Sequence, residues 1–295
     1  MVILKLFENI FKYIIMNLKN KIIKYGSFIF VVAIFFACNK PERPALGDYP
    51  KDTNPPGGPL KFYSTFEATK AGNVFDSIRS NFGTPTSATV VNGGVEGNAV
   101  QATNNGFVNF PSANDFGSST SFTISFWMNI TMAQKDNNHA VGVLAFANSK
   151  NFWGNITFYA DNNAKSPSDS MDLKIHFNAP NNGDNWNFAN YNFAHAWPKM
   201  YDGNWHEVGF TYDANAKVGT VYRDGVQFDQ KTNQVIAFEN SSSLIIGGFQ
   251  EAAGIVDNYG NNSWMAGFPG KIDNVRLYGV ALSASDMQAL YNNKQ

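Results

Sequence analysis

From Leu60 onward, apolar and polar residues alternate in short runs that are separated by clusters of glycine, asparagine, aspartate and serine. Alternation with a period of two is typical of β-strands that turn one face toward a core. In the run at 122–130, one face carries only large apolar side chains, which are Phe122, Ile124, Phe126, Met128 and Ile130. Repeated short runs of this kind predict an all-β fold, a two-sheet antiparallel sandwich.

The same pattern predicts further strands at 61–66, 107–110, 141–146, 155–159, 173–177, 206–212, 218–223, 226–229, 243–247 and 271–278. Asp224 and Gly225 stand between two of these runs and predict a two-residue hairpin, because both residue types tolerate a positive φ. Near the C-terminus, Ser283 and Asp286 have the spacing of a helix cap. We therefore expect a short C-terminal helix that closes the domain.

The N-terminal region has the pattern of an export signal. After Met16, three lysines precede an apolar run that extends from Phe28 to Ala37. This run is shorter than the roughly 18 to 20 apolar residues that a membrane-spanning helix needs. The pattern predicts a signal peptide over residues 1–37, with Met16 as the true start.

Cys38 is the only cysteine and directly follows this apolar run. The sequence Phe35-Phe36-Ala37-Cys38 resembles the lipobox of bacterial lipoproteins, with Phe35 in place of the usual leucine. The resemblance implies lipidation of Cys38, export, and anchoring in the bacterial cell envelope, with the outer membrane as the expected location. Six prolines after Cys38 predict an extended tether over residues 38–59, ahead of one domain over residues 60–295.

Composition excludes some functions. The net charge is −1 and charged residues make up 15% of the chain, so the sequence lacks the basic surface that nucleic-acid binding requires. A single cysteine allows no disulfide within the exported domain, so its core alone must stabilise it.

Three segments together resemble one known family. They are FTISFWMN at 122–129, DGNWHEVGFTYDANAKVGTVYRDGVQFD at 202–229, and GKIDNVRLYGVALSASDMQALY at 270–291. In order and spacing they look like the laminin G-like branch of the concanavalin A-like lectin/glucanase superfamily. The resemblance covers roughly residues 62–291. It implies a jelly roll of two packed antiparallel sheets, often with a calcium ion, and carbohydrate or protein ligands bound on the concave face or on rim loops.

Some members of that superfamily are glycoside hydrolases, which need two carboxyl groups across the scissile bond. No Glu-x-Asp-x-x-Glu string occurs here, and Glu207 has Gly209 and Thr211 where a partner on the same face of the strand would stand. We expect Glu207 to be a solvated strand residue and His206 to be a packed structural one. The sequence therefore predicts no catalytic residue and a protein that is not an enzyme.

Calcium is the one cofactor that the sequence suggests. Glu67 in the first strand, the turn at Asn73, and Asp273 in the last strand could converge as oxygen ligands if the terminal strands are neighbours. An alternative is that Asp273 pairs with Arg276 or caps a turn. A second candidate position is the asparagine-rich loop at 257–262.

The best ligand-binding stretch is 181–201, which is rich in asparagine and aromatic residues. Exposed aromatic rings stack on the apolar faces of sugars, and asparagine amides match their hydroxyl groups. The candidate rings are Trp186, Tyr191 and Trp197, with Trp153, Tyr259 and Trp264 in neighbouring loops. The alternative is that these rings pack beneath long loops, since tryptophan is highly buried on average.

Together these features predict a lipid-anchored protein that binds a polysaccharide or other glycan without catalysis. An adhesion or scaffold protein that binds other proteins is the first alternative, because aromatic loops also form protein-binding hot spots. A divergent polysaccharide hydrolase or lyase is the second.

Overall fold

The computed structural model describes residues 12, 16, 58–67, 69–79, 81–161, 169–179, 185–187, 196–256 and 262–294. The chain divides into two compact units, residues 1–45 and 46–295. The predicted signal peptide, apart from Lys12 and Met16, lies outside the described residues, as do Cys38 and most of the tether. Among the described residues, no helix combines the length and the apolar character that crossing a membrane requires.

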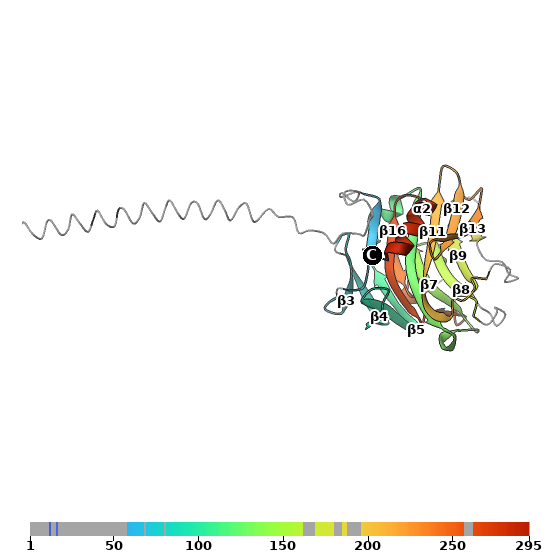
Figure 1. Ribbon diagram of the computed structural model, residues 1–295, viewed down its shortest axis with the longest axis horizontal. Coiled ribbons are helices and arrows are strands. Elements are labelled where there is room, and N and C mark those ends of the chain that lie inside the picture. Colours follow the sequence, from blue (N-terminus) through green and yellow to red (C-terminus); the bar gives the residue numbers. More distant parts are fainter. Residues whose placement is uncertain are drawn as a thin grey trace, which may run out of the picture. The chain divides into compact units, whose positions relative to one another are not determined.

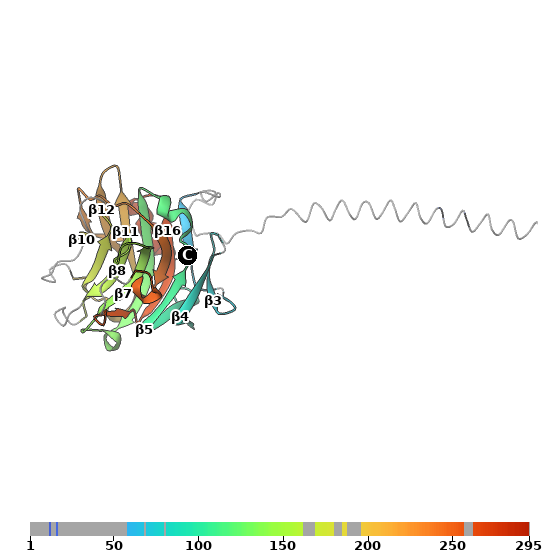
Figure 2. The same ribbon diagram turned by 180° about the vertical axis from the view of Figure 1, so that it is seen from behind.

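The strands of the second unit form two packed layers (Figures 1 and 2). The first layer runs in the order β10 (Asn185–Asn187), β9 (Leu173–Phe177), β8 (Ile156–Asp161), β7 (Ala140–Asn148), β14 (Ser241–Ile246), β5 (Asn98–Phe110) and β4 (Asn81–Asn92). β3 (Asn73–Asp76) and β2 (Thr69–Lys70) extend it beyond β4, and β15 (Met265–Gly267) pairs in parallel with β7.

The second layer runs in the order β16 (Lys271–Tyr278), β6 (Phe122–Thr131), β11 (Asp202–Asp213), β12 (Val218–Arg223) and β13 (Val226–Lys231). β1 (Leu60–Ser64) pairs with β16, so the first and last strands are neighbours. The long strand β5 joins the layers, because Val100 pairs with Ile272 of β16 and Val108 pairs with Ile246 of β14. The antiparallel two-sheet sandwich predicted from the sequence is confirmed.

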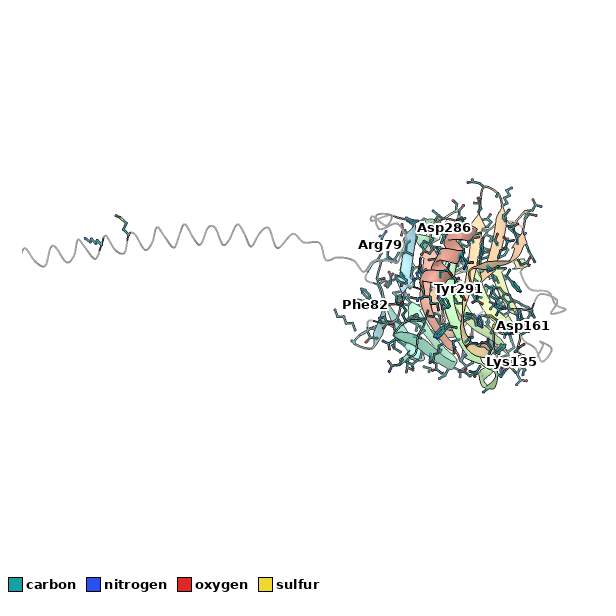
Figure 3. All side chains as sticks on the ribbon, viewed as in Figure 1. Arg79, Phe82, Lys135, Asp161, Asp286 and Tyr291 are labelled. Carbon is teal, nitrogen blue, oxygen red and sulfur yellow. The ribbon has the colours of Figure 1, made fainter. Side chains whose placement is uncertain are left out.

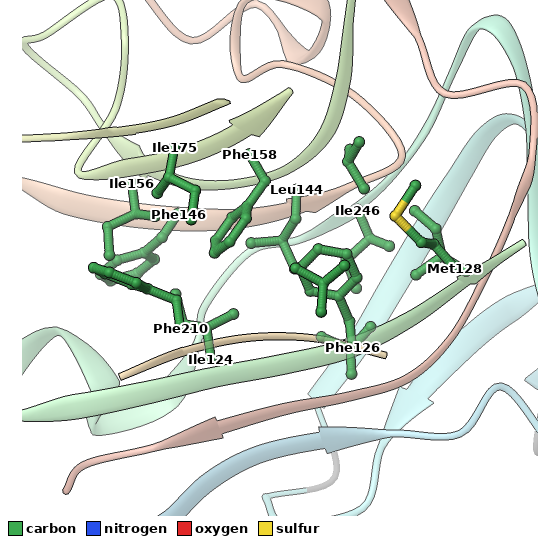
Figure 4. Packing of buried hydrophobic residues seen from close by; sticks show 14 of the residues in the cluster. Ile124, Phe126, Met128, Leu144, Phe146, Ile156, Phe158, Ile175, Phe210 and Ile246 are labelled. Carbon is green, nitrogen blue, oxygen red and sulfur yellow. The ribbon is translucent and has the colours of Figure 1, made fainter. Parts of the chain in front are cut away.

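The main core lies between the two layers. Phe126 and Phe210 of the second layer meet Phe158 and Leu144 of the first, all fully buried (Figure 4). All five apolar residues predicted to share one face of the run at 122–130 belong to this core. Alternation along the strands therefore identified the inner faces correctly, since successive side chains of a strand point to opposite sides.

The predicted boundaries of β9, β12 and β16 match the structure, whereas β4 was not predicted. Most residues of β4 are exposed or half-buried, so it lacks the apolar alternation that identified the other strands. It also contains Pro85 and a register shift between Thr86 and Ala88. β3 pairs with β4 only from Asn81 to Gly83, so Pro85 and the register shift lie where β4 pairs on one side only, as is typical of edge strands.

The predicted turn and cap are both present. Asp224 and Gly225 have φ values of 53° and 73° and connect β12 to β13, with Arg223 opposite Val226. The helix α2 (Ala284–Asn293) begins with a capping box, in which the Ser283 and Asp286 side chains each accept from the other's backbone N–H. Short 3-10 turns are η1 (Asn114–Ser118), η2 (Met132–Gln134) and η3 (Glu251–Ala253).

Helix α2 covers the outer face of the second layer. Tyr291 stacks on Trp127 of β6, with ring centroids 5.4 Å apart. A side chain at Gly209 of β11 would force the Met287 methyl group to move, so the glycine leaves room for the helix to pack here. Both faces of β6 are therefore buried, including Thr123, Ser125 and Trp127 on its outer side.

Candidate functional site

The outer face of the first layer carries a different set of residues. In β8 and β9 the core takes Phe158 and Ile175, so their strand neighbours lie on the opposite side. The register places Tyr159 opposite Lys174 and Thr157 opposite His176. This face thus brings aromatic and ionisable side chains together on neighbouring strands.

Aromatic side chains from the connecting segments cover part of this face. Together with Tyr159 of β8 they form what we call the aromatic patch, whose members are Phe152, Trp153, Tyr159, Phe249 and Trp264. The ring centroid of Trp153 lies 5.9 Å from that of Tyr159 and 5.7 Å from that of Trp264. Trp264 is 37% exposed, whereas the other four rings are buried. A ligand at this surface would therefore meet the Trp264 ring first.

Beside the patch lies the charged row, which consists of Asp161, Asp172 and Lys174. The Lys174 Nζ lies 2.6 Å from Asp161 Oδ2 and 3.8 Å from Asp172 Oδ2. Burial raises the pKa of Asp172 to about 6, and the Asp161 charge adds to this, although the Lys174 ammonium opposes it. The Asp161 side chain is 28% exposed and lies near the Lys135 end of the sandwich (Figure 3).

The sheet register connects the two groups. Ala140 of β7 pairs with Asp161 on one side and with Met265, the residue after Trp264, on the other. The Ala140 N–H also donates to the Trp264 carbonyl at 2.8 Å. Trp264 and Asp161 therefore flank one strand, an arrangement that can stack a ring and accept hydrogen bonds from adjacent hydroxyl groups.

The sequence did not identify the charged row. Asp161 and Asp172 are separated along the chain, and only the pairing of β8 with β9 brings them together. The available signal was the alternation in β8 and β9, which places Asp161 and Lys174 away from the core. It could not give the register between the two strands, because the connection between them is long.

The predicted sugar-stacking residues have different outcomes. Trp197 is 0% exposed, so its prediction as an exposed platform is wrong. Its backbone bridges to Met171 and its ring packs 4.6 Å from that of Phe228, which holds it in the core. Trp153 is buried in the patch, and Trp264 is exposed. Tyr191 and Tyr259 lie outside the described residues, and for Trp186 only the backbone pairing with His176 is described.

Glu207 is not solvated as predicted, because it is 0% exposed beneath the helix-covered face of the second layer. Its Oε1 accepts from the Ser125 hydroxyl at 2.7 Å. Burial raises the pKa of Glu207 to about 7, although the Ser125 hydrogen bond and the Arg276 charge lower it. A polysaccharide cannot reach this carboxyl while α2 is in place.

His206 is packed, as predicted. Its two ring nitrogens lie 2.9 Å from Asp224 Oδ2 and 3.2 Å from Asp202 Oδ1. Burial opposes protonation, but the hydrogen bond and charge of Asp224 outweigh it and raise the pKa of His206. The imidazole thus connects the start of β11 to the Asp224-Gly225 hairpin, which is a structural role.

Glu67 and Asp273 hold the same loop, residues 93–98. Asp273 Oδ2 accepts from the Val95 N–H at 2.8 Å, and Glu67 Oε1 accepts from the Asn98 N–H at 2.7 Å. Burial raises the pKa of Asp273 to about 7, opposed by the loop N–H groups and supported by the Glu67 charge. No contact described places Asn73 beside these carboxylates.

The fit to calcium is therefore partial. The described residues contain no group of three or more His, Cys, Asp or Glu side chains arranged to hold a metal ion. Two carboxylates around one loop have suitable charge, and side chains at Gly94 and Gly97 would collide with Asp273 and Glu67. The loop backbone would have to supply the remaining oxygens that calcium needs.

Comparison with known proteins defines the class. A family profile described as the concanavalin A-like lectin/glucanases superfamily, in its laminin G-like branch, matches residues 102–288. This match spans more than half of the chain, so the protein belongs to that superfamily. No curated protein sequence matches the chain significantly.

Solved structures share the fold at low sequence identity. Domain 4 of AbnA, a GH43 extracellular arabinanase from Geobacillus stearothermophilus in complex with arabinotriose, has a TM-score of 0.53 and 19% identity, over 79% of this chain and 98% of that domain. Trypanosoma rangeli sialidase with a difluoro-KDN ligand has a TM-score of 0.54 and 16% identity, over 79% of this chain and 32% of that one. The binding domain of botulinum neurotoxin DC with rat synaptotagmin II has a TM-score of 0.53 and 12% identity, over 80% and 52%.

Proposed function

We propose that this protein is a lipid-anchored, non-catalytic glycan-binding protein of the bacterial cell envelope. The glycan binds on the outer face of the first layer, where Trp264 and Asp161 flank β7. The observation that carries the proposal is the partial exposure of Trp264 above an otherwise buried aromatic patch. Domain 4 of the arabinanase, solved with arabinotriose, supports a carbohydrate ligand for this fold.

The arrangement suits a sugar for two physical reasons. A large ring that is fixed by neighbouring rings loses little entropy when a sugar stacks on it. The adjacent carboxylate of Asp161 can accept hydrogen bonds from hydroxyl groups while Lys174 balances part of its charge. Stacking supplies affinity and the carboxylate fixes orientation.

Catalysis at this site is the less favoured function. A glycosidase uses two carboxyl groups, and Asp161 and Asp172 could supply two, but both lie beside the Lys174 ammonium. Burial raises the pKa of Asp172 to about 6, as a general acid requires, but only 4% of its side chain is exposed, so a glycosidic oxygen has little access to it. The site therefore fits recognition better than proton transfer.

Protein binding is a second candidate function. The neurotoxin binding domain with a related fold was solved in complex with synaptotagmin II, a protein. An exposed tryptophan beside charged groups is also typical of protein-binding hot spots. This alternative predicts a saturable protein partner and no retained glycan.

A glycan screen tests the proposal. The purified protein is applied to immobilised neutral and acidic polysaccharides, and the material bound is analysed for shortened or unsaturated products. We expect at least one glycan to be retained with no product formed. Failure to retain any glycan contradicts the proposal, and product formation identifies an enzyme instead.

The anchor is tested separately. Lipidation requires the Cys38 thiol, so the Cys38→Ser variant should lose incorporation of a labelled fatty acid and its membrane association. A single methionine change far from the signal, such as Met132→Leu at an exposed position, is the matched control and should leave labelling intact. Unchanged labelling of Cys38→Ser contradicts lipid anchoring at this residue.

Calcium is proposed as a structural ion between Glu67 and Asp273. Bound there, it would offset the repulsion between the two carboxylates and fix the 93–98 loop. Added calcium should raise the melting temperature, because it would bind the folded state only. Asp273→Asn should remove most of that rise. If calcium added to protein that has first been freed of metal ions does not change the melting temperature, the proposed calcium site is wrong.

A further inference from the structure

We infer that the outer-face site binds uncharged glycans more tightly than glycans that carry carboxylate or sulfate groups. The inference rests on the proposed function and deepens it, because it specifies the ligand class. It is based on two observations: the charges around Trp264, and the contacts that the neighbouring lysines already make.

In the part of the site that the structure describes, acidic residues outnumber basic ones. Asp161 and Asp172 belong to the charged row itself. Asp136 Oδ2 lies 2.7 Å from Nδ1 of His139, the residue before Ala140, which pairs with Asp161. A fourth acid, Asp169, accepts from the Tyr201 N–H through its backbone carbonyl.

Among the described residues of this region, Lys174 and Lys135 are both engaged. Lys174 is held between the two carboxylates of the charged row, and only 10% of its side chain is exposed. Lys135 lies over the Tyr201 ring, with its Nζ 5.2 Å from the centroid. Burial lowers the pKa of Lys135, opposed by the charge of Asp169. An anionic ligand that bound through Lys174 or Lys135 would have to take that cation from its present partners.

The carboxylates also act directly on a ligand. Hydroxyl groups donate to carboxylate oxygens, so a neutral sugar gains charge-assisted hydrogen bonds from Asp161. A ligand carboxylate donates nothing and repels the same group. Burial already raises the pKa of Asp172 to about 6, and a second negative charge nearby would oppose its ionisation further.

Matched derivatives of one polysaccharide test this selectivity. A neutral polysaccharide retained in the screen is converted to a carboxymethyl derivative and, as a neutral control of similar size, to a hydroxyethyl derivative. At about 20 mM salt we expect the carboxymethyl form to bind roughly tenfold more weakly than the hydroxyethyl form. Raising the salt to about 500 mM should reduce the difference in affinity between the two derivatives, because salt screens repulsion between exposed charges.

A variant that neutralises Asp161 tests whether this selectivity arises at the proposed site. Asp161→Asn removes one negative charge and releases Lys174 from its nearest partner. The ratio of hydroxyethyl to carboxymethyl affinity should therefore fall about threefold or more. Asp229→Asn on β13 of the other layer changes the net charge equally and is the matched control, with no expected change in selectivity. Melting curves confirm that both variants are folded.

Each outcome separates the two proposals. Equal binding of the two derivatives, or anionic binding that weakens as salt rises, overturns the charge inference while the glycan-binding function stands. Retention of no glycan in either form overturns both.

Discussion

The two outer faces of the sandwich carry similar kinds of residues but differ in what covers them. On the first layer, four of the five rings of the aromatic patch come from connecting segments, and Trp264 stays partly exposed. On the second layer, helix α2 covers Trp127, Glu207 and Arg276 so that each is at most 2% exposed. Access to a ligand is therefore decided by a distant segment, the C-terminal helix, rather than by the composition of either strand face.

The covered face is held by polar contacts as well as by packing. Arg276 donates from Nη2 to the Tyr63 hydroxyl at 3.0 Å, and that hydroxyl donates to Asn274 at 3.2 Å. The Arg276 guanidinium also lies 4.5 Å from the centroid of the Tyr63 ring. Buried ionised groups are costly to leave unpaired, so this face should be far more sensitive to mutation than the open one.

The largest expected effect is the loss of Arg276. Arg276→Ala removes a buried cation that contacts Tyr63 and balances Glu207, and we expect the free energy of unfolding to fall by about 3–5 kcal/mol. Arg79→Ala is the control, since Arg79 forms an exposed ion pair with Asp115 at 3.3 Å, and exposed pairs contribute about 1 kcal/mol or less. Denaturant unfolding of both variants measures the difference, and similar losses would contradict the distinction between the two faces.

The next effect concerns the tryptophan that was predicted to be exposed. Trp197→Ala opens a cavity beside Phe228 and Met171, and should lower the free energy of unfolding by about 3 kcal/mol or more. The loss should appear in denaturation curves at any glycan concentration. A stable Trp197→Ala protein with weakened glycan binding would restore the original sequence prediction.

A smaller effect is expected from pH. Because burial raises the pKa of Glu207 from its ordinary value of 4.5 to about 7, the folded protein keeps a proton that the unfolded chain releases between these values. This contribution to stability is full below about pH 4.5 and is lost as the pH rises through about 7. The raised pKa values of Asp273, Asp172 and His206 act in the same direction, so Glu207 accounts for part of the pH dependence.

We therefore expect a higher melting temperature at pH 5 than at pH 8. Glu207→Gln should make this dependence less steep, because the amide does not titrate while the other groups still do. Glu239→Gln at an exposed glutamate is the control and should leave it unchanged. A stability that rises steadily from pH 5 to pH 8 would contradict the burial of Glu207 as an ionisable group.

Much of the fold could be predicted from the sequence, because its determinants are local. Alternation identified the core face of β6, Asp224-Gly225 identified the hairpin, and Ser283 identified the start of α2. Each of these depends on residues within a few positions of one another. β4 was missed because its exposed side chains carry no period.

The site was less predictable, because its geometry depends on long-range pairing. The alternation around Glu207 indicates a residue on the outer face of its strand, and the local sequence does not show that α2 covers this face. Trp197 occurs in an asparagine-rich stretch typical of a loop, but its bridge to Met171 places it in the core. Trp264 was named among the secondary candidates, yet its position opposite Asp161 across β7 follows only from the strand register.

The most direct test of the account is a glycan titration combined with a denaturation curve for Trp264→Ala. We predict roughly a tenfold loss of glycan affinity, equivalent to about 1.4 kcal/mol, and a change in unfolding free energy below about 1 kcal/mol. Val226→Ala, at an exposed apolar residue on β13, is the matched control and should change neither quantity. Unchanged glycan affinity in a folded Trp264→Ala protein would contradict the assignment of the outer face of the first layer as the binding site.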